Sequence, residues 1–578
     1  MPPASHTHGC CVPHKELALL VDSSGELPEA GPAAEKTEEK GPATHAFFGR
    51  IITMNESMPE AEAIAVRHRK ILAVGSREDV EGRCGHRTKR VELGSNVMYP
   101  GFVEPHMHIW STALIYRWLD CSPFDNRTVD DVISKIEKGV EDARPGEWVT
   151  GKLYDPSLFP GNPDLTIKEL DPIAPDNPVS ILNASMHFAY VNSKALELVG
   201  YTDTTPDPPG GTIYRDGRGR PTGVLGEISA IAPCLKKMPK LKIAAGLLEN
   251  ISAITRDAAR VGVTCMREAL TGSFLGEKEI LLLKFMKDTG RLQTRISVAV
   301  SDNGADIWEK SRHVAPGRGD DLLRISAWKL VADGSNQGRS GYLKEPYLNT
   351  DARGMLDVTE DYLTKRMSWC EENGWQLMVH ANGDAAVEIV TSAYHSVLKK
   401  AGPKGLRHRI EHCSLVPDDD LFAKMAEVGV SPSFLINHVY YWGKALKDDL
   451  IGEERAAYLD RVASALSHGL KITFHSDYNV SPINPLHCVQ VAVTRKMWDG
   501  GDVLNPEQRI GVYDALKAMT VNAAWQLKME GVVGSLEPGK YADMVILERD
   551  PQKVEPDEID SIKVIETWMN GRQTYVIS

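Results

Sequence analysis

Residues 99–108 read YPGFVEPHMH, and this stretch decides the fold. Its apolar residues favour a buried β-strand that ends in two histidines, His106 and His108. Side chains two positions apart in a strand point to the same side, so both imidazoles can bind one cation. Two histidines at this spacing are weak support for a metal site on their own, but the preceding YPGFVEP makes the signal strong. The stretch therefore predicts a strand that ends at a metal site.

Further apolar runs of strand length follow along the chain, and helix-like or long connecting segments separate them. Together with NVMYPGFVEPH (96–106) they predict eight strands, and eight strand–helix units are typical of a (β/α)8 TIM barrel, an α/β fold. The other predicted strands are GVTCMREAL (262–270), RISVAVS (295–301), RISAWKLVADG (324–334), WQLMVHANG (375–383), HRIEHCSL (408–415), GVSPSFLI (429–436) and KITFHSD (471–477).

The polar residues of these strands gather at their C-terminal ends, which is the face where barrel enzymes place their chemistry. Neutral imidazoles and a carboxylate suit Zn²⁺ and similar ions, and three or four protein ligands leave a position open for water. We therefore expect one or two divalent cations at the barrel mouth. The residues that different strands would bring there are His106, His108, Glu268, Lys329, His380, His412 and Asp477.

The intervals between these residues indicate an insertion. His380 follows Lys329 by 51 residues and precedes His412 by 32, whereas 221 residues separate His108 from Lys329. That long interval holds only three strand–helix units, so roughly 100 residues exceed what the barrel needs. We place the insertion at about 121–225, where the Gly- and Pro-rich PDPPGGTIYRDGRGRPTG (206–223) suggests a lid or pocket wall.

Short strands separated by polar turns also occur at both ends of the chain, from His45 to Val97 and in the last fifty residues. Segments from the two termini can pair in one sheet. We therefore predict a small composite β-sandwich domain built from 44–98 and 529–578, with the barrel at 99–528. Residues 1–43 lack apolar periodicity and are rich in Pro, Ala, Gly and Glu, so a flexible tail is expected there.

The tail contains residue types that bind metals, but their spacing matches no closed structural site. A solvated segment is the more common outcome for such a composition, so we predict no specific metal site there. The residues concerned are His6, His8, Cys10, Cys11 and His14.

Composition limits the possible functions. The formal charge of −13 argues against a general affinity for nucleic acid or anionic membranes, which reward clustered Lys and Arg. No apolar run approaches the roughly 20 residues of a membrane helix, and the N-terminus lacks the features of a signal peptide. Nine cysteines, an odd number, form no disulfide framework and favour a reducing cytoplasm. We predict a cytoplasmic protein that acts on a small molecule, with neither nucleic acid nor membrane as partner, and that forms a homo-oligomer, specifically a dimer.

An ordered series of segments resembles the amidohydrolase superfamily, and specifically its YtcJ-like branch, which includes N-substituted formamide deformylase. The resemblance runs from about Phe47 to Val576. It implies metal-dependent hydrolysis of a carbon–nitrogen bond, such as an amide, an N-formyl or N-acyl group or a cyclic amide. The segments that carry it are YPGFVEPHMH, VHANGDAA, RIEHCSLV, HSDYNVSPINP and VVGSLEPGKYADMVIL.

The resemblance also implies roles for the residues at the strand ends. His106 and His108 would bind the more buried cation, His380 and His412 would bind the more exposed one, and Asp477 would complete the site. Asp477 would also take a proton from water and return it to the departing nitrogen. Relatives usually have Gly-Ser-Asp here, whereas this chain has His475-Ser476-Asp477, so an additional imidazole is expected near the base.

Lys329 would be repelled by neighbouring cations unless its charge were changed. Carboxylation would convert it into a bridging carbamate, and several branches of the superfamily use such a lysine on the fourth strand. Glu268 is the alternative bridge, because a carboxylate needs no modification to span two cations. The sequence favours Lys329 and leaves Glu268 open.

A further group of residues lies in segments that resemble the pocket lining of the branch. Packing or a surface position is an equally good interpretation for any one of them, and His187 in SMHFAYVNS is the strongest candidate. The candidates for substrate contact are His187, Tyr154, Asp155, Arg339, Tyr347, His438 and, beside the base, His475.

Other functions stay open at this point. The same barrel and ligand types can support decarboxylation, deamination of a ring or ester hydrolysis. A non-enzymatic scaffold derived from such an enzyme is disfavoured because no expected metal ligand is missing. These motifs do not identify the substrate, because residues of the insertion and the barrel loops determine substrate specificity.

Overall fold

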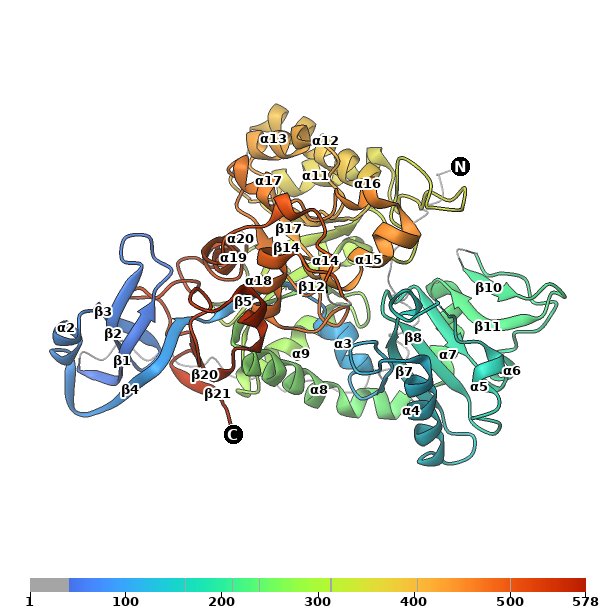
Figure 1. Cartoon of the computed structure of the whole chain (residues 1–578), viewed down its shortest axis with the longest axis horizontal. Helices are drawn as coiled ribbons and strands as arrows, with labels where there is room; N and C mark the ends of the chain where they lie inside the picture. Colours follow the sequence, from blue (N-terminus) through green and yellow to red (C-terminus); the bar gives the residue numbers. More distant parts are fainter. Residues whose placement is uncertain are drawn as a thin grey trace.

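Three sheets organise the protein, and the computed structural model describes residues 41–161, 163–209, 211–238, 240–311, 314–402, 404–498 and 501–578. The three sheets contain eight, seven and six strands, and the eight-stranded sheet lies in the middle of the molecule (Figure 1). The predicted tail, with its histidines and cysteines, lies almost entirely outside the described residues, and the first strand already begins at Ala43.

The eight-stranded sheet is the predicted barrel. All its neighbouring strands pair in parallel, and β18 at one end of the strand order contacts β5 at the other. Each of the eight segments expected from the sequence contains one strand of this sheet, which confirms the (β/α)8 interpretation. They are β5 (Phe102–Met107), β12 (Val263–Thr271), β13 (Arg295–Ser301), β14 (Leu323–Val331), β15 (Gln376–Ala381), β16 (Arg409–His412), β17 (Ser431–Phe434) and β18 (Thr473–Phe474).

One detail of the first strand was wrong. We predicted a single strand over 96–106, but β4 (Cys84–Pro100) belongs to the seven-stranded sheet and β5 to the barrel. Gly101 makes the change of sheet possible, because a Cβ at this position would lie 2.3 Å from the side chain of Thr264. The Gly101 N–H donates to the carbonyl of Asp543 at 3.0 Å, so the crossing point is also held by the C-terminal segment.

Strands from both ends of the chain form the seven-stranded sheet, as predicted. β4 pairs in parallel with β1 and antiparallel with β19, where Tyr99 faces Val545. The Ile71 N–H donates to the carbonyl of Lys540 at 2.9 Å, so β3 also contacts the segment that precedes β19, and residues from both ends of the chain share one core. The remaining bounds are β1 (Ala43–Ile52), β2 (Glu60–Arg67), β3 (Lys70–Gly75), β19 (Met544–Leu547), β20 (Val564–Met569) and β21 (Arg572–Val576).

The six-stranded sheet lies between β5 and β12 in the chain and has its own apolar cores. It sits on the opposite side of the barrel from β1–β4 (Figure 1). The domain limits predicted from the sequence, with an insertion at about 121–225, remain our proposal for how the chain divides. The strands are β6 (Leu119–Asp120), β7 (Val149–Tyr154), β8 (Val179–Asn183), β9 (Phe188–Val191), β10 (Thr212–Arg215) and β11 (Pro221–Gly226).

Helices connect these strands, and several begin at side chains that cap them. Thr128 and Asp131 form a reciprocal capping box at the start of α4 (Val129–Glu141), which satisfies backbone donors that the helix itself leaves unpaired. The other main helices are α3 (Ile109–Ile115), α5 (Ile167–Leu170), α6 (Ser193–Val199), α7 (Ile228–Lys237), α8 (Lys240–Arg260), α9 (Glu277–Asp288), α11 (Glu360–Glu372), α12 (Asp384–Ala401), α13 (Asp419–Val428), α14 (Asn437–Tyr441), α17 (Val462–Ser467), α18 (Pro485–Thr494), α19 (Val512–Ala518) and α20 (Val521–Gln526).

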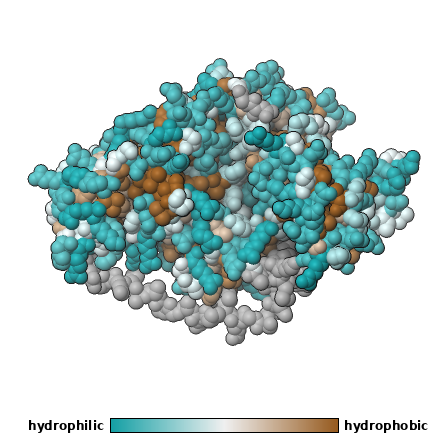
Figure 2. Space-filling model, turned by 60° about the horizontal axis from the view of Figure 1, so that its bottom comes forward, coloured by the Kyte–Doolittle hydropathy of each residue, from teal (hydrophilic) through white to brown (hydrophobic). Residues whose placement is uncertain are grey.

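The surface is mainly hydrophilic on the face shown in Figure 2, with separate apolar areas. In the described part of the chain no helix is both long enough and apolar enough to cross a membrane. The cytoplasmic location and the homodimer stay predictions. The large apolar side chains exposed among the described residues come from distant parts of the sequence: Met58, Leu198, Tyr214, Ile307, Met355, Val576 and Ile577.

Candidate active site

The register of the barrel strands brings the predicted ligands to one end of the barrel. His380 pairs with Val331 of β14, and His412 pairs with Ala381 of β15. On the other side of the barrel, Met107, between His106 and His108, faces Glu268. Parallel strands all end at the same mouth, so side chains far apart in the sequence become neighbours there.

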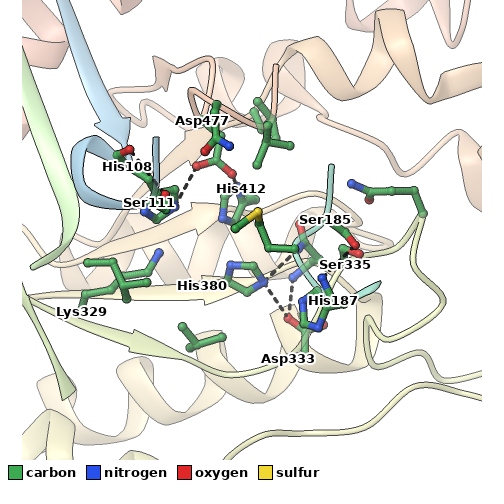
Figure 3. Close-up of a pocket in the computed structure, with 18 of the residues that line it drawn as sticks. His108, Ser111, Ser185, His187, Lys329, Asp333, Ser335, His380, His412 and Asp477 are labelled. Atoms are coloured by element: carbon green, nitrogen blue, oxygen red, sulfur yellow. Dashed lines mark hydrogen bonds and ion pairs between the residues drawn. The ribbon is translucent and has the colours of Figure 1, made fainter. Parts of the chain in front are cut away.

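Asp477 lies among three of these imidazoles. Its Oδ1 is 3.3 Å from His106 Nε2 and 3.1 Å from His108 Nε2, and its Oδ2 is 3.9 Å from His412 Nδ1. The ring of His380 is next to that of His412, with centroids 4.4 Å apart. Figure 3 shows His412 between Asp477 and His380, with His108 on the far side of the carboxylate.

The donor atoms at the centre of this group fit a divalent cation. One ligand atom each from His106, His412 and Asp477 lie within 4.8 Å of one another, and all three residues are buried. Among the described residues, His106 Nε2, His412 Nδ1 and Asp477 Oδ1 have no hydrogen-bond partner. Buried polar atoms without partners are costly, and imidazole nitrogens with a carboxylate oxygen are the usual donors to zinc.

The protonation states suit metal binding as well. Burial, with a smaller contribution from Lys329, lowers the pKa of His106 well below its usual value and that of His380 to about 3. Burial and the nearby His380 likewise lower the pKa of His412. Burial alone would raise the pKa of Asp477, but neighbouring groups, His108 first, bring it down to about 2. The site therefore presents neutral imidazoles and an ionised carboxylate near neutral pH.

Glu411, which we did not identify from the sequence, orients His106. It accepts a hydrogen bond from His106 Nδ1 at 2.5 Å, and its two oxygens accept from Arg409 Nε and Nη2 at 2.7 Å each. An ionised carboxylate can only accept, so the His106 proton is on Nδ1 and the lone pair of Nε2 points toward Asp477. The available signal was a pair of opposite charges within the short strand RIEH.

Glu104, also missed, holds the loop that carries Asp477. Its carboxylate accepts hydrogen bonds from the Ser476 backbone N–H at 3.2 Å and from Ser476 Oγ at 2.8 Å. Burial raises the pKa of Glu104 to about 8, although the Ser476 contacts act in the opposite direction. The His108 N–H donates to the Tyr478 carbonyl at 2.8 Å. The contacts between Glu104 and Ser476 and between His108 and Tyr478 therefore fix the position of Asp477 relative to β5.

The two candidate bridges lie in different surroundings. Lys329 is 2% exposed, yet it lines the cavity that His108, His380, His412 and Asp477 also line. Glu268 is outside that lining, and backbone N–H groups occupy both of its oxygens. Those N–H groups belong to Ile109, Trp110 and Leu270. Glu268 thus anchors the turn that follows His108.

The cavity at the barrel mouth has a volume of about 130 Å³ and is partly open to solvent. One wall is formed by residues between β8 and the start of α7, including Ser185, His187 and Glu227. His187 Nδ1 is 3.0 Å from Glu227 Oε2, and its ring faces the barrel side of the cavity (Figure 3). On the barrel side His438 also lines the cavity, with its Nδ1 3.2 Å from Ser414 Oγ. The structure therefore brings two of the substrate candidates, His187 and His438, to the site.

The other substrate candidates lie elsewhere. Asp155 and Arg339 line a neighbouring recess that shares Gln337 with the main cavity. Tyr154 and Tyr347 are buried outside the cavity lining, and their hydroxyls donate to backbone carbonyls at 2.6 Å and 2.8 Å. His475 is buried too, with its ring stacked on that of His106 at 4.6 Å. It therefore lies beneath the cavity rather than in its wall.

Two residues after β14 and β15 complete the surroundings of His380. Asn382 Nδ2 is 2.9 Å from His380 Nε2, and Asp333 accepts from the backbone N–H groups of Asn382 and Gly383 at 2.9 and 2.8 Å. Burial raises the pKa of Asp333 to about 7. Their polar character at the strand ends was visible in the sequence, but their partners were not.

Comparisons with known proteins agree with this geometry. Residues 90–575 match the model of the amidohydrolase family. The chain is 28% identical to the putative amidohydrolase YtcJ of Bacillus subtilis (strain 168) over 544 residues, covering 91% of this chain and 98% of the relative. It is 26% identical to N-substituted formamide deformylase of Arthrobacter pascens, covering 89% and 95%. An uncharacterized metal-dependent hydrolase from Pyrococcus horikoshii OT3 has the same fold, with a TM-score of 0.70, 24% identity and coverage of 89% and 99%.

Proposed function

Because this chain belongs to the amidohydrolase family, we propose that it hydrolyses a carbon–nitrogen bond of a small molecule with a divalent cation in its site. Membership of this family supports hydrolase activity, and the bond, the metal and the substrate are our proposal. The observation that carries it is the convergence of buried, unsatisfied donor atoms of His106, His412 and Asp477 beside the cavity.

The residues proposed to hold the cation are the histidines at the strand ends together with Asp477. A divalent cation there would polarise the substrate carbonyl and make a water molecule more acidic. Zinc suits the donor set best, since imidazole and carboxylate are its common ligands. Whether one or two ions bind depends on His380, which lies on the other side of His412 from Asp477 (Figure 3), and on Lys329, which lines the same cavity.

Asp477 is proposed as the group that moves the proton. It lines the cavity and is ionised, so it can accept a proton from water and deliver it to the departing nitrogen. Glu104 and Ser476 support this role, because their hydrogen bonds keep the loop from moving the carboxylate away. His475 is a less suitable base because it does not line the cavity.

Lys329 is proposed as a carboxylated bridge. The backbone contacts of Glu268 support this choice, since a carboxylate whose oxygens already accept several N–H groups is poorly placed to bind ions as well. An unmodified lysine among metal ligands would oppose cation binding, whereas a carbamate would attract it.

A substrate screen with the metal content verified tests the proposal. The Arthrobacter pascens relative is an N-substituted formamide deformylase, so N-formyl, N-acyl and cyclic amides should be tried first. We expect hydrolysis that incorporates one oxygen atom from ¹⁸O-labelled water, and loss of activity after exhaustive chelation with recovery on adding zinc. Full activity of a metal-free preparation would contradict the metal assignment. Release of carbon dioxide or ring ammonia instead would point to a decarboxylase or a deaminase.

A further inference from the structure

A second concave surface lies on the outside of the molecule and shares no lining residue with the active-site cavity. It is formed by the β2–β3 turn, the β20–β21 turn and the connection from α9 to β13, and we call it the basic groove. None of its described lining residues is acidic, although the chain contains 79 acidic and 66 basic residues. The charged or titratable residues that line it are Arg67, His68, Arg69, Lys70, Lys287 and Arg572.

The walls of the basic groove are preformed. The Ala542 N–H donates to the Arg69 carbonyl at 2.9 Å, next to the Ile71–Lys540 contact described above. Gly571 packs so closely on the β2–β3 turn that a Cβ would lie 1.9 Å from the carbonyl oxygen of His68. The two turns therefore touch, and a ligand would not need to assemble them.

In the described part of the chain, some basic side chains of the groove already bind other residues of the protein, and others do not. Lys287 Nζ pairs with Asp320 at 2.7 Å, and Arg67 donates to the Gly41 carbonyl at 2.7 Å. Within the described ranges, the exposed side chains of Arg69 and Arg572 form neither an ion pair nor a hydrogen bond. Guanidinium groups bind carboxylates in a paired geometry, so these two arginines suit an acidic ligand.

The groove also offers apolar contacts. Leu72, Leu292, Leu322 and Met569 line it between the charged residues. A ligand that combines acidic and apolar side chains would match both features, which free phosphate or a nucleotide would not. The groove therefore fits an acidic peptide with apolar residues.

The chain contains such a peptide near its start. Residues 16–27 read ELALLVDSSGEL, with Glu16, Asp22 and Glu26 beside five leucines and valines. This segment lies outside the described residues, but Gly41, which follows it in sequence, is bound by Arg67 at the groove. The 14 residues that follow Leu27, up to Gly41, can span up to about 45 Å when extended, so residues 16–27 can fold back toward the groove from Gly41, which is bound by the groove residue Arg67. We propose that the basic groove binds residues 16–27 of the same chain.

Zero-length carbodiimide coupling on the full chain tests this proposal. The reagent joins carboxylates to lysine amines only when they touch, and mass spectrometry identifies the joined residues. We expect Glu16, Asp22 or Glu26 to be joined to Lys70 or Lys287. Coupling of Lys287 to Asp320, whose atoms are 2.7 Å apart, serves as an internal control.

Charge reversal separates specific binding from chance contact. Arg69→Glu combined with Arg572→Glu should reduce the tail-to-groove products about tenfold or more, because repulsion replaces two attractive contacts. The same products should fall at high salt, which screens exposed charges. Arg87→Glu combined with Arg218→Glu is the matched control, because both arginines are exposed, lie outside the groove and change the net charge equally.

Four results would overturn the proposal. One is coupling of the tail carboxylates to lysines all over the surface, and another is coupling that the groove variant does not reduce. A mixture of isotope-labelled and unlabelled chains provides the third. Coupled products that join a labelled chain to an unlabelled chain would show that the groove binds the tail of a second copy. Tight binding of pyrophosphate without any tail-to-groove product would instead make the groove a site for small anions.

Discussion

Replacing Glu411 by Gln should weaken binding of the proposed cation, because Glu411 orients the His106 imidazole. In the native protein Glu411 Oε2 accepts from both His106 Nδ1 and Arg409 Nη2, while Oε1 accepts from Arg409 Nε. A Gln amide can replace only one of these oxygens. Its NH₂ group must then face either Arg409 Nε or His106 Nδ1, which are themselves donors.

The size of the effect follows from these contacts. Loss of a carboxylate that orients a metal-binding histidine typically weakens metal affinity 10- to 100-fold, or about 1.4–2.7 kcal/mol. The substitution also leaves the fully buried guanidinium of Arg409 without its counter-ion, and breaking a buried ion pair costs about 3–5 kcal/mol of stability. We therefore expect Glu411→Gln to lower both zinc affinity and the stability of the metal-free protein.

A double variant separates these two effects. Glu411→Gln with Arg409→Met removes both charges, so much of the lost stability should return, while zinc affinity should stay low because His106 still lacks an anionic acceptor. Zinc affinity is measured by competition with a chelator, and stability by the denaturant midpoint of the metal-free protein. Wild-type zinc affinity in Glu411→Gln would refute the positioning role. Recovery of zinc affinity in the double variant would show that the single variant lost affinity only because the protein was less stable.

Three further predictions concern single side chains. Asp477→Asn should bind substrate nearly normally and lose about 10²–10⁴-fold in turnover, with metal content measured in parallel; a variant that keeps its metal and its rate would leave proton transfer to another group. Lys329→Ala should lose activity that a short carboxylic acid partly restores, whereas Glu268→Ala should keep more activity, and the reverse ranking would favour Glu268 as the bridge. Asp543→Asn should destabilise the protein by about 3–5 kcal/mol, because the buried Arg295, bound by both oxygens of Asp543 at 2.7 and 2.9 Å, would lose its counter-ion; an unchanged denaturant midpoint would contradict this.

Much of the site could be predicted because its residues carry local signals. His106, His380 and Asp477 each follow an apolar run of strand length, and the common mouth of a parallel barrel brings such positions together. Gln376 and Arg267 show the opposite case. Both are polar residues within apolar strands, and no local pattern indicated that they form a hydrogen bond with each other inside the barrel.

The lining of the cavity was harder to predict than the group of histidines with Asp477 at the strand ends. Tyr154 and Asp155 are adjacent in sequence, yet the first is buried in an apolar core of the six-stranded sheet and the second lines the neighbouring recess. Loop and insertion residues have no periodic pattern that fixes their direction, so only the packed structure shows which of them face the cavity.

By itself, the sequence determined the eight strands, the composite sheet and the residue types at the strand ends, because apolar periodicity and the residues at strand ends are local properties of the chain. The tertiary structure alone decided that Glu411, 305 residues from His106, fixes its orientation, and that Glu268 anchors a turn instead of facing the cavity. It also placed the break between two sheets at Gly101. Each of these features depends on a contact between distant segments, and such contacts form only when the barrel closes and packs.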